Sequence, residues 1–133
     1  MLDQGTVFIM TNSKKKEIPK FHLRMKLDIG EDAIGPGKAK LLHAVDQYGS
    51  ISAAARNMGI NYRRAWFLLE TMNTALGQPV ALTTKGGSGG GGARLTDAGR
   101  AVLIAYENCA RATDKSTYKI LSDLQLTLAS LED

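Results

Sequence analysis

Two helical segments are separated by only two residues, Gly59 and Ile60. This short connection constrains the fold more than any other feature of the sequence. The first segment, SISAAARNMG, offers a hydroxyl at Ser50 or Ser52 to cap the free amide groups at its start. The second begins at Asn61, a natural N-cap, and its apolar residues recur at helical spacing. The predicted buried stripe of this helix is Ala65, Leu68, Leu69 and Met72. Helices joined by so tight a turn cannot lie antiparallel, so the sequence predicts a helix-turn-helix motif.

A strand and a further helix are predicted before this motif. Phe21–Ile29 alternates apolar and polar residues, which is typical of a half-buried strand, and turn residues follow around Gly35–Gly37. Lys38–Tyr48 repeats apolar residues at helical spacing and ends at Gly49. The predicted buried faces are Phe21, Leu23, Met25, Leu27 and Ile29 on the strand, and Leu41, Leu42, Ala44, Val45 and Tyr48 on the helix.

The run from Gly86 to Gly92 contains six glycines in seven residues and has three interpretations: a linker, a phosphate-binding loop or a hairpin tip. A linker would separate two parts with their own cores, which neither half of this chain has. A phosphate-binding loop needs Gly-Lys-Ser/Thr before a helix, whereas this run leads into Ala93, Arg94 and Leu95. Short β-prone segments flank the run, so the sequence predicts a glycine-rich hairpin, or wing, that carries Lys85 and Arg94.

The C-terminal part is predicted to be helical from the N-cap Thr96 onward, with Asp97 favourably placed in the first turn. Val102, Tyr106 and Cys109 form one predicted stripe, and leucines later recur at the spacing of a coiled-coil seam. These leucines are Leu121, Leu124, Leu128 and Leu131. Because this register places polar residues on the seam, the helix is expected to bend or break near residues 113–117. The leucines either pack on their own domain or pair with a second chain, and pairing is favoured.

The net charge is +4, and the basic excess is concentrated between Gly35 and Arg100, where eight basic residues face three acidic ones. Such a segment is suited to binding a polyanion, because contacts of lysine and arginine with phosphate release counterions. A solvated basic surface without a partner is the alternative. The chain has one cysteine, and its N-terminal basic run follows an apolar stretch, the reverse of a secretory signal, so a cytoplasmic location is expected.

The stretch GSISAAARNMGINYRRAWFLLETMN, followed by KGGSGGGGARLTDAGR, resembles the DNA-binding domain of ModE-type molybdate-responsive regulators. More distantly it resembles the winged helix-turn-helix of LysR-type regulators. The shared features are a Ser-rich entry, a Gly-Ile turn, an Ala-Trp pair and a glycine-rich wing ending in Leu-Thr-x-x-Gly. The resemblance covers about residues 21–133, and it implies DNA binding and a C-terminal dimerisation helix. Because the chain stops at Asp133, the molybdate-binding domains of full-length members are not expected, and no cofactor is predicted.

In a helix-turn-helix protein the first turn of the second helix enters the major groove. Arg63 and Arg64 lie in this turn, where the positive helix end disfavours them, so they are expected to contact an external anion. Solvated surface arginines are the alternative. The predicted DNA-binding residues are Asn61, Tyr62, Arg63, Arg64, Trp66, Lys85, Arg94, Ser50 and Ser52.

Several of these residues have a second interpretation. For Trp66 core packing is favoured over base contact, and Tyr62 either packs on the first helix of the motif or contacts DNA. Helix capping is favoured over phosphate binding for Ser50 and Ser52. The wing cations are expected to reach phosphates or the minor groove, with a solvated hairpin as the alternative.

The predicted fold class is α+β and mainly α: a disordered arm over residues 1–20, a winged helix-turn-helix domain over 21–100 and a dimerisation helix over 101–133. No enzyme is expected, because His22 and His43 lack metal-ligand spacing and Cys109 has no evident base. The predicted function is a homodimeric transcriptional regulator that binds double-stranded DNA sequence-specifically. The alternatives are an interaction module that pairs with a full-length homologous regulator, and an oxyanion sensor at a dimer interface.

Overall fold

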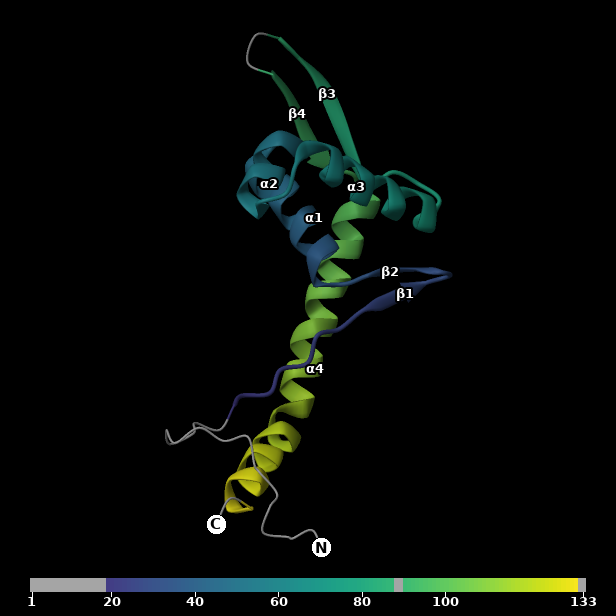
Figure 1. Cartoon of the computed structure of the whole chain (residues 1–133). Helices are drawn as coiled ribbons and strands as arrows, with labels where there is room; N and C mark the ends of the chain where they lie inside the picture. Colours follow the sequence, from purple (N-terminus) through teal and green to yellow (C-terminus); the bar gives the residue numbers. More distant parts are fainter. Residues whose placement is uncertain (1–18, 88–89, 132–133) are drawn as a thin grey trace, which may run out of the picture. The chain divides into compact units, whose positions relative to one another are not determined.

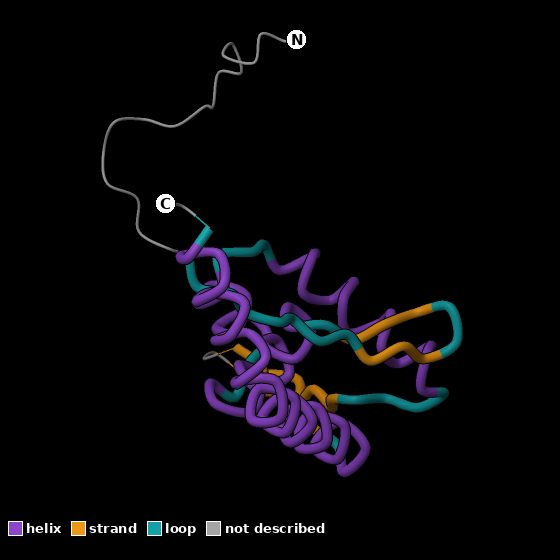
Figure 2. Tube along the Cα trace, turned by 90° about the horizontal axis from the view of Figure 1, so that it is seen from below, coloured by secondary structure: helices purple, strands orange, loops and turns teal. Residues whose placement is uncertain are grey.

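The computed structural model describes residues 19–87 and 90–131, which form two short β-hairpins and four α-helices (Figure 1). The elements are β1 (Leu27–Ile29), β2 (Asp32–Ile34), α1 (Pro36–Tyr48), α2 (Ile51–Met58), α3 (Tyr62–Leu76), β3 (Ala81–Gly87), β4 (Gly90–Leu95) and α4 (Asp97–Ser130). Helix dominates the described chain, and the strand pairs are the orange segments of Figure 2. Leu23–Thr117 forms one compact unit, and the other described residues, 19–22 and 118–131, belong to a second. The predicted arm at residues 1–20 lies almost entirely outside the described residues.

The predicted helix-turn-helix is confirmed in the first unit. The Ser50 side chain caps α2 by accepting a hydrogen bond from the Ala53 amide at 2.9 Å. Gly59 ends α2 in the left-handed conformation, with φ at 72°, and the Ile60 amide donates to the Ala55 carbonyl at 3.0 Å. The chain therefore reverses direction sharply and enters α3 within the predicted gap.

The core of this unit lies among α1, α2, α3 and the base of the wing. Leu41, Leu42, Val45, Ala65, Leu69 and Met72 are buried, as the sequence predicts. Two predictions at the edge of these stripes are wrong, because Leu68 is only half-buried and Tyr48 is 41% exposed. Tyr48 is the last residue of α1, where the helix ends at Gly49 and no element covers the ring.

The predicted strand Phe21–Ile29 is mostly wrong. Only Leu27–Ile29 pairs with another strand, β2, across a turn in which Gly30 has φ at 60°. Phe21, Leu23 and Leu27 are exposed, whereas Met25 and Ile29 pack against the core. The Tyr106 hydroxyl donates to the Met25 carbonyl at 2.8 Å, so a helix side chain satisfies the backbone here and no strand ladder forms.

The predicted wing is confirmed as the antiparallel hairpin β3–β4, which extends beyond α2 and α3 (Figure 1). Its register pairs Ala81 with Leu95 and Thr83 with Ala93, and it becomes irregular between Thr84 and Gly87. The Ala93 amide donates to the Gly49 carbonyl at 2.8 Å. The wing is thereby attached to the turn between α1 and α2.

The base of the wing is closed by a group of backbone and side-chain contacts. Thr96 caps α4, as predicted: its hydroxyl accepts from the Gly99 amide at 2.9 Å and donates to the Pro79 carbonyl at 2.8 Å. The Asn73 side chain accepts from the Val80 amide at 2.8 Å, a contact between α3 and the wing that the sequence did not reveal. A Cβ atom at Gly99 would collide with the Val80 carbonyl group, so this close approach requires glycine.

The helix α4 is continuous from Asp97 to Ser130, so the predicted interruption near residues 113–117 is wrong. The stretch contains no glycine or proline, and the Thr117 hydroxyl donates to the Thr113 carbonyl at 2.6 Å within the helix. The predicted stripe also needs correction, because Tyr106 is buried but Val102 is half-buried and Cys109 is exposed. The stripe that is buried consists of Gly99, Leu103 and Tyr106.

One ion pair and one histidine–carboxylate contact join α1 to the first turns of α4. The Arg100 guanidinium lies 2.9 Å from the Asp46 carboxylate, and this hydrogen bond raises the pKa of Arg100. His43 lies 3.6 Å from Glu107. All four side chains are at least one third exposed, so these contacts orient α4 more than they stabilise it.

In the second unit, the leucine seam of α4 is only partly covered. Leu121 and Leu128 are half-buried, while Leu124 is 40% and Leu131 is 71% exposed. Further apolar side chains of this segment are also exposed, namely Tyr118, Ile120 and Leu126. Exposed apolar side chains that recur along a helix are typical of a surface that pairs with a partner.

Candidate nucleic-acid interface

The first turn of α3 presents the residues predicted to bind DNA. The Asn61 side chain caps the helix by accepting from the Arg64 amide at 2.7 Å. Tyr62, Arg63 and Arg64 are all exposed. Within residues 19–87 and 90–131, no carboxylate lies within ion-pair distance of either arginine. Two unpaired cations at the positive end of a helix are held against the dipole, and an external anion would relieve this repulsion.

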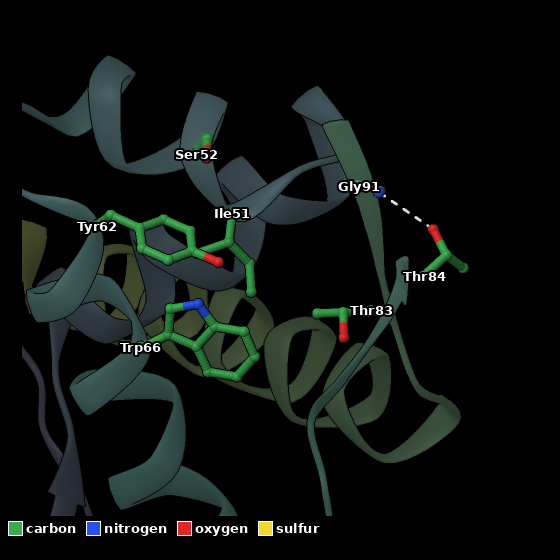
Figure 3. Close-up of a pocket in the computed structure, with 8 residues that line it drawn as sticks. Ile51, Ser52, Tyr62, Trp66, Thr83, Thr84 and Gly91 are labelled. Carbon is green, nitrogen blue, oxygen red and sulfur yellow. Dashed lines mark hydrogen bonds between the residues drawn. The ribbon is translucent and has the colours of Figure 1, made fainter. Parts of the chain in front are cut away.

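Tyr62 and Trp66 lie one turn apart on α3 and line a shallow cleft toward the wing (Figure 3). Their rings meet edge to face, with 6.2 Å between centroids. The cleft has a volume of about 180 Å³ and is lined by Ile51, Ser52, Tyr62, Trp66, Thr83, Thr84, Gly91 and Gly92. Trp66 is half-buried and packs against the core, so the preference for core packing agrees with its position.

The start of α2 gives its two serines different surroundings. The Ser50 oxygen is occupied by the Ala53 amide, so capping is its structural role. Ser52 is exposed at the rim of the cleft, one residue into α2 (Figure 3). Of the two, Ser52 is the hydroxyl that faces solvent beside the N-terminus of a helix, where anions are favoured.

The wing carries Lys85 and Arg94, which are both exposed. Arg94 pairs across the hairpin with exposed Leu82, whereas its neighbours Ala93 and Leu95 are buried on the other face. Because side chains alternate along a strand, Arg94 must point away from the core. The Gly92 amide donates to the Thr84 hydroxyl at 3.1 Å, the dashed line of Figure 3, and fixes the hairpin below its tip.

One exposed aromatic residue of α3 is absent from the set of DNA-binding residues predicted from the sequence. Phe67 is 56% exposed, and the Arg64 guanidinium lies over its ring, 5.5 Å from the centroid. The sequence does indicate that Phe67 is exposed. It follows the buried Ala65 by two residues, and about 200° of rotation places it on the opposite side of the helix.

Metal-binding groups and membrane-spanning helices were sought among the described residues. No group of three or more His, Cys, Asp and Glu side chains is placed to hold a metal ion there. None of the described helices is apolar over a length that would cross a bilayer.

Comparison with known proteins relates the chain to bacterial regulators. Residues 37–100 match the model of the bacterial regulatory helix-turn-helix proteins of the lysR family. The molybdenum-pterin-binding protein MopB of Rhodobacter capsulatus is 40% identical over 95 residues, which cover 71% of this chain and 34% of MopB. The transcriptional regulator ModE of Haemophilus influenzae is 37% identical over 98 residues, covering 74% of this chain and 38% of ModE.

The chain spans about a third of the length of these relatives. Among solved structures, the complex of the CbnR DNA-binding domain with DNA is 24% identical, with a TM-score of 0.48, and covers 63% of this chain and 95% of that one. Residues 37–100 are therefore similar to the helix-turn-helix domain of the lysR-family regulatory proteins, and 98 residues of the chain are similar to part of the regulator ModE.

Proposed function

We propose that this protein regulates transcription by binding duplex DNA at specific sequences. The observation that carries the proposal is the exposed first turn of α3, where Arg63 and Arg64 have no carboxylate partner among the described residues. Arginine can bind guanine through two hydrogen bonds in the major groove. An arginine-rich helix start on a LysR-type domain therefore fits direct reading of bases.

We assign the remaining predicted residues to different parts of the DNA according to the element that carries them. Asn61 and Tyr62 stand beside the arginines, and Ser52 lies at the rim of the adjoining cleft. Lys85 and Arg94 extend the basic surface along the wing. We assign phosphate or minor-groove contacts to the wing and base contacts to α3, while Ser50 and Trp66 support the interface by capping and packing.

Pairing through α4 is the second part of the proposal. The exposed apolar surface around Leu124 and Leu131 supports it, and Leu121 and Leu128 lie on the same seam. A homodimer presents two recognition helices about 34 Å apart, one helical turn of DNA, and therefore selects a nearly palindromic site.

The direct test is selection of genomic DNA fragments by the purified protein at about 0.15 M salt, near physiological screening. We expect enrichment of a nearly palindromic sequence. Parallel selections with and without molybdate test the alternative of an oxyanion sensor. This alternative predicts that the enriched DNA differs between the two selections and that the protein takes up molybdate in equilibrium dialysis. Failure to enrich any sequence would contradict the proposed function.

Replacing both arginines, Arg63→Ala with Arg64→Ala, should abolish specific binding while the protein still unfolds at its normal temperature. A matched control removes two exposed cations elsewhere in the unit, Lys40→Ala with Arg111→Ala, and should only weaken binding modestly. Gel-shift titrations of both double variants decide the point. Equal losses would show that total charge, and not the position on α3, determines binding.

The exposed apolar segment of α4 also allows a second function, in which this chain pairs with a longer homologous regulator and modulates it. The ModE relative of Haemophilus influenzae is similar to this chain over 98 residues, which supports a mixed dimer between this chain and a longer homologue. Co-purification with a longer homologue, together with weak DNA binding by the isolated chain, would favour this function over the first.

A further inference from the structure

The solvent-facing side of α3 has an aromatic residue at its centre. Phe67 is 56% exposed and lies about 200° around the helix from buried Ala65, at about 100° per residue. Arg63 and Thr74 share this side and are exposed as well. A large apolar ring thus stands in the middle of the surface that the proposed function places in the major groove.

The surroundings of Phe67 favour nucleic acid over protein as the group that covers it. Arg63 lies one turn before it, and the Arg64 guanidinium is positioned over its ring at 5.5 Å. Among the described residues these cations have no ion-pair partner, whereas one acid, Glu70, follows on the helix. Phosphates on both sides of a groove complement the arginines, and stacking of Arg64 restricts the orientation of the ring before binding.

The major groove offers one apolar group to such a ring. It is the 5-methyl group of thymine, which phenylalanine is able to contact directly, whereas the other base edges present hydrogen-bond donors and acceptors. Packing against that methyl group buries part of the exposed ring without leaving a polar group unpaired. An aromatic residue next to arginines therefore combines methyl contact with hydrogen bonding to the neighbouring base or phosphate.

We propose that Phe67 reads thymine through its 5-methyl group and is a specificity-determining residue of this domain, an inference that rests on the proposed DNA-binding function. Each half-site then contains a thymine whose methyl group contributes to affinity through Phe67. Arg64 is the neighbouring positioning residue, because its guanidinium lies over the ring.

The test exchanges each thymine of the selected site for deoxyuridine, which removes the methyl group and nothing else. We expect one thymine per half-site at which this exchange lowers the DNA affinity of the wild-type protein about fourfold. That loss is equivalent to the burial of one methyl group. In Phe67→Ala the same exchange should have no effect, and Phe67→Leu should retain part of it. Thr74→Ala, from the same side of the helix, is the matched control and should respond like the wild type.

The outcomes separate this inference from the function on which it rests. A wild-type protein that binds its site specifically but responds equally to deoxyuridine with and without Phe67 would overturn the inference alone. A wild-type protein that selects no DNA would overturn both. Because the Phe67 ring is more than half exposed, Phe67→Ala should remain folded, and thermal unfolding verifies this.

Discussion

At the scale of single residues, Gly99 is closely surrounded by the backbone of another segment. The backbone of Val80 passes directly over it, and an added Cβ atom would lie 2.9 Å from the Val80 carbonyl carbon. Gly99→Ala must displace the start of the wing or of α4, and overpacking of this kind lowers the free energy of unfolding by about 3 kcal/mol. Urea denaturation measures the loss. Gly37→Ala is the control, because nothing lies within 4 Å of its added Cβ atom, and its unfolding free energy should stay the same or rise slightly.

Tyr106 connects the buried face of α4 to the segment before β1. Burial raises the pKa of its phenol, an effect that Arg24 opposes, and the hydroxyl donates to the Met25 carbonyl. The folded state favours the neutral phenol of Tyr106. Its contribution to the free energy of unfolding is therefore complete below the unfolded pKa of about 10, and it is lost as the pH rises through the folded pKa.

We therefore expect Tyr106→Phe to lower the free energy of unfolding by about 1 kcal/mol at pH 7. The variant should also show a smaller loss of stability above pH 10 than the wild type. Denaturation curves between neutral and alkaline pH test both effects. Tyr48→Phe, at an exposed tyrosine, should match the wild type throughout. An unchanged alkaline profile in Tyr106→Phe would mean that other groups cause the decline.

At the scale of elements, the wing consists of an anchored base and a glycine-rich tip. The base is held by Ala93, Asn73 and Thr96, through hydrogen bonds to or from other elements. Shortening the run Gly86–Gly92 by two residues should reduce DNA affinity several-fold and leave the unfolding temperature within about 2 °C, since the anchoring residues Ala93, Asn73 and Thr96 lie outside the run. Fluorescence anisotropy on the selected site measures the affinity. Undiminished affinity would leave the wing without a role in binding.

The elements that the sequence predicted correctly are those with local determinants. The caps at Ser50, Asn61 and Thr96 act within three residues of themselves, and Gly49, Gly59 and Gly77 end their helices by local backbone geometry. The length of β1 and the exposure of Cys109 depend on what packs on them from distant parts of the chain. The same reason hid the Asn73 contact to Val80, which joins positions seven residues apart across a turn.

The candidate interface was predictable to a similar degree. The arginines, the aromatic pair and the wing cations follow from motif position, and the structure exposes the charged ones as expected. Phe67 was missed because exposed apolar residues are common on protein surfaces and have no motif of their own. Its meaning depends on its contact with Arg64, which only the three-dimensional arrangement provides.

At the scale of the whole molecule, the proposed homodimer depends on the exposed seam of α4. Replacing Leu124 and Leu131 with aspartate should convert the dimer to a monomer, because both side chains are exposed and charges would oppose each other across the interface. Sedimentation velocity at micromolar concentration measures the change, and the loss of the dimer should weaken binding to a palindromic site. Ile104→Asp, an exposed position in the other unit, should leave the dimer intact. A wild-type monomer would contradict the pairing proposal.

The exposed thiol of Cys109 belongs to the only cysteine in the chain. Each molecule can therefore be labelled at a single defined position without further substitutions. A nitroxide attached there would give one sharp distance distribution for a symmetric pair of identical chains, and no such distance when each chain is bound to an unlabelled longer homologue. The cysteine thus provides spectroscopic access to the composition of the complex, with the native sequence unchanged.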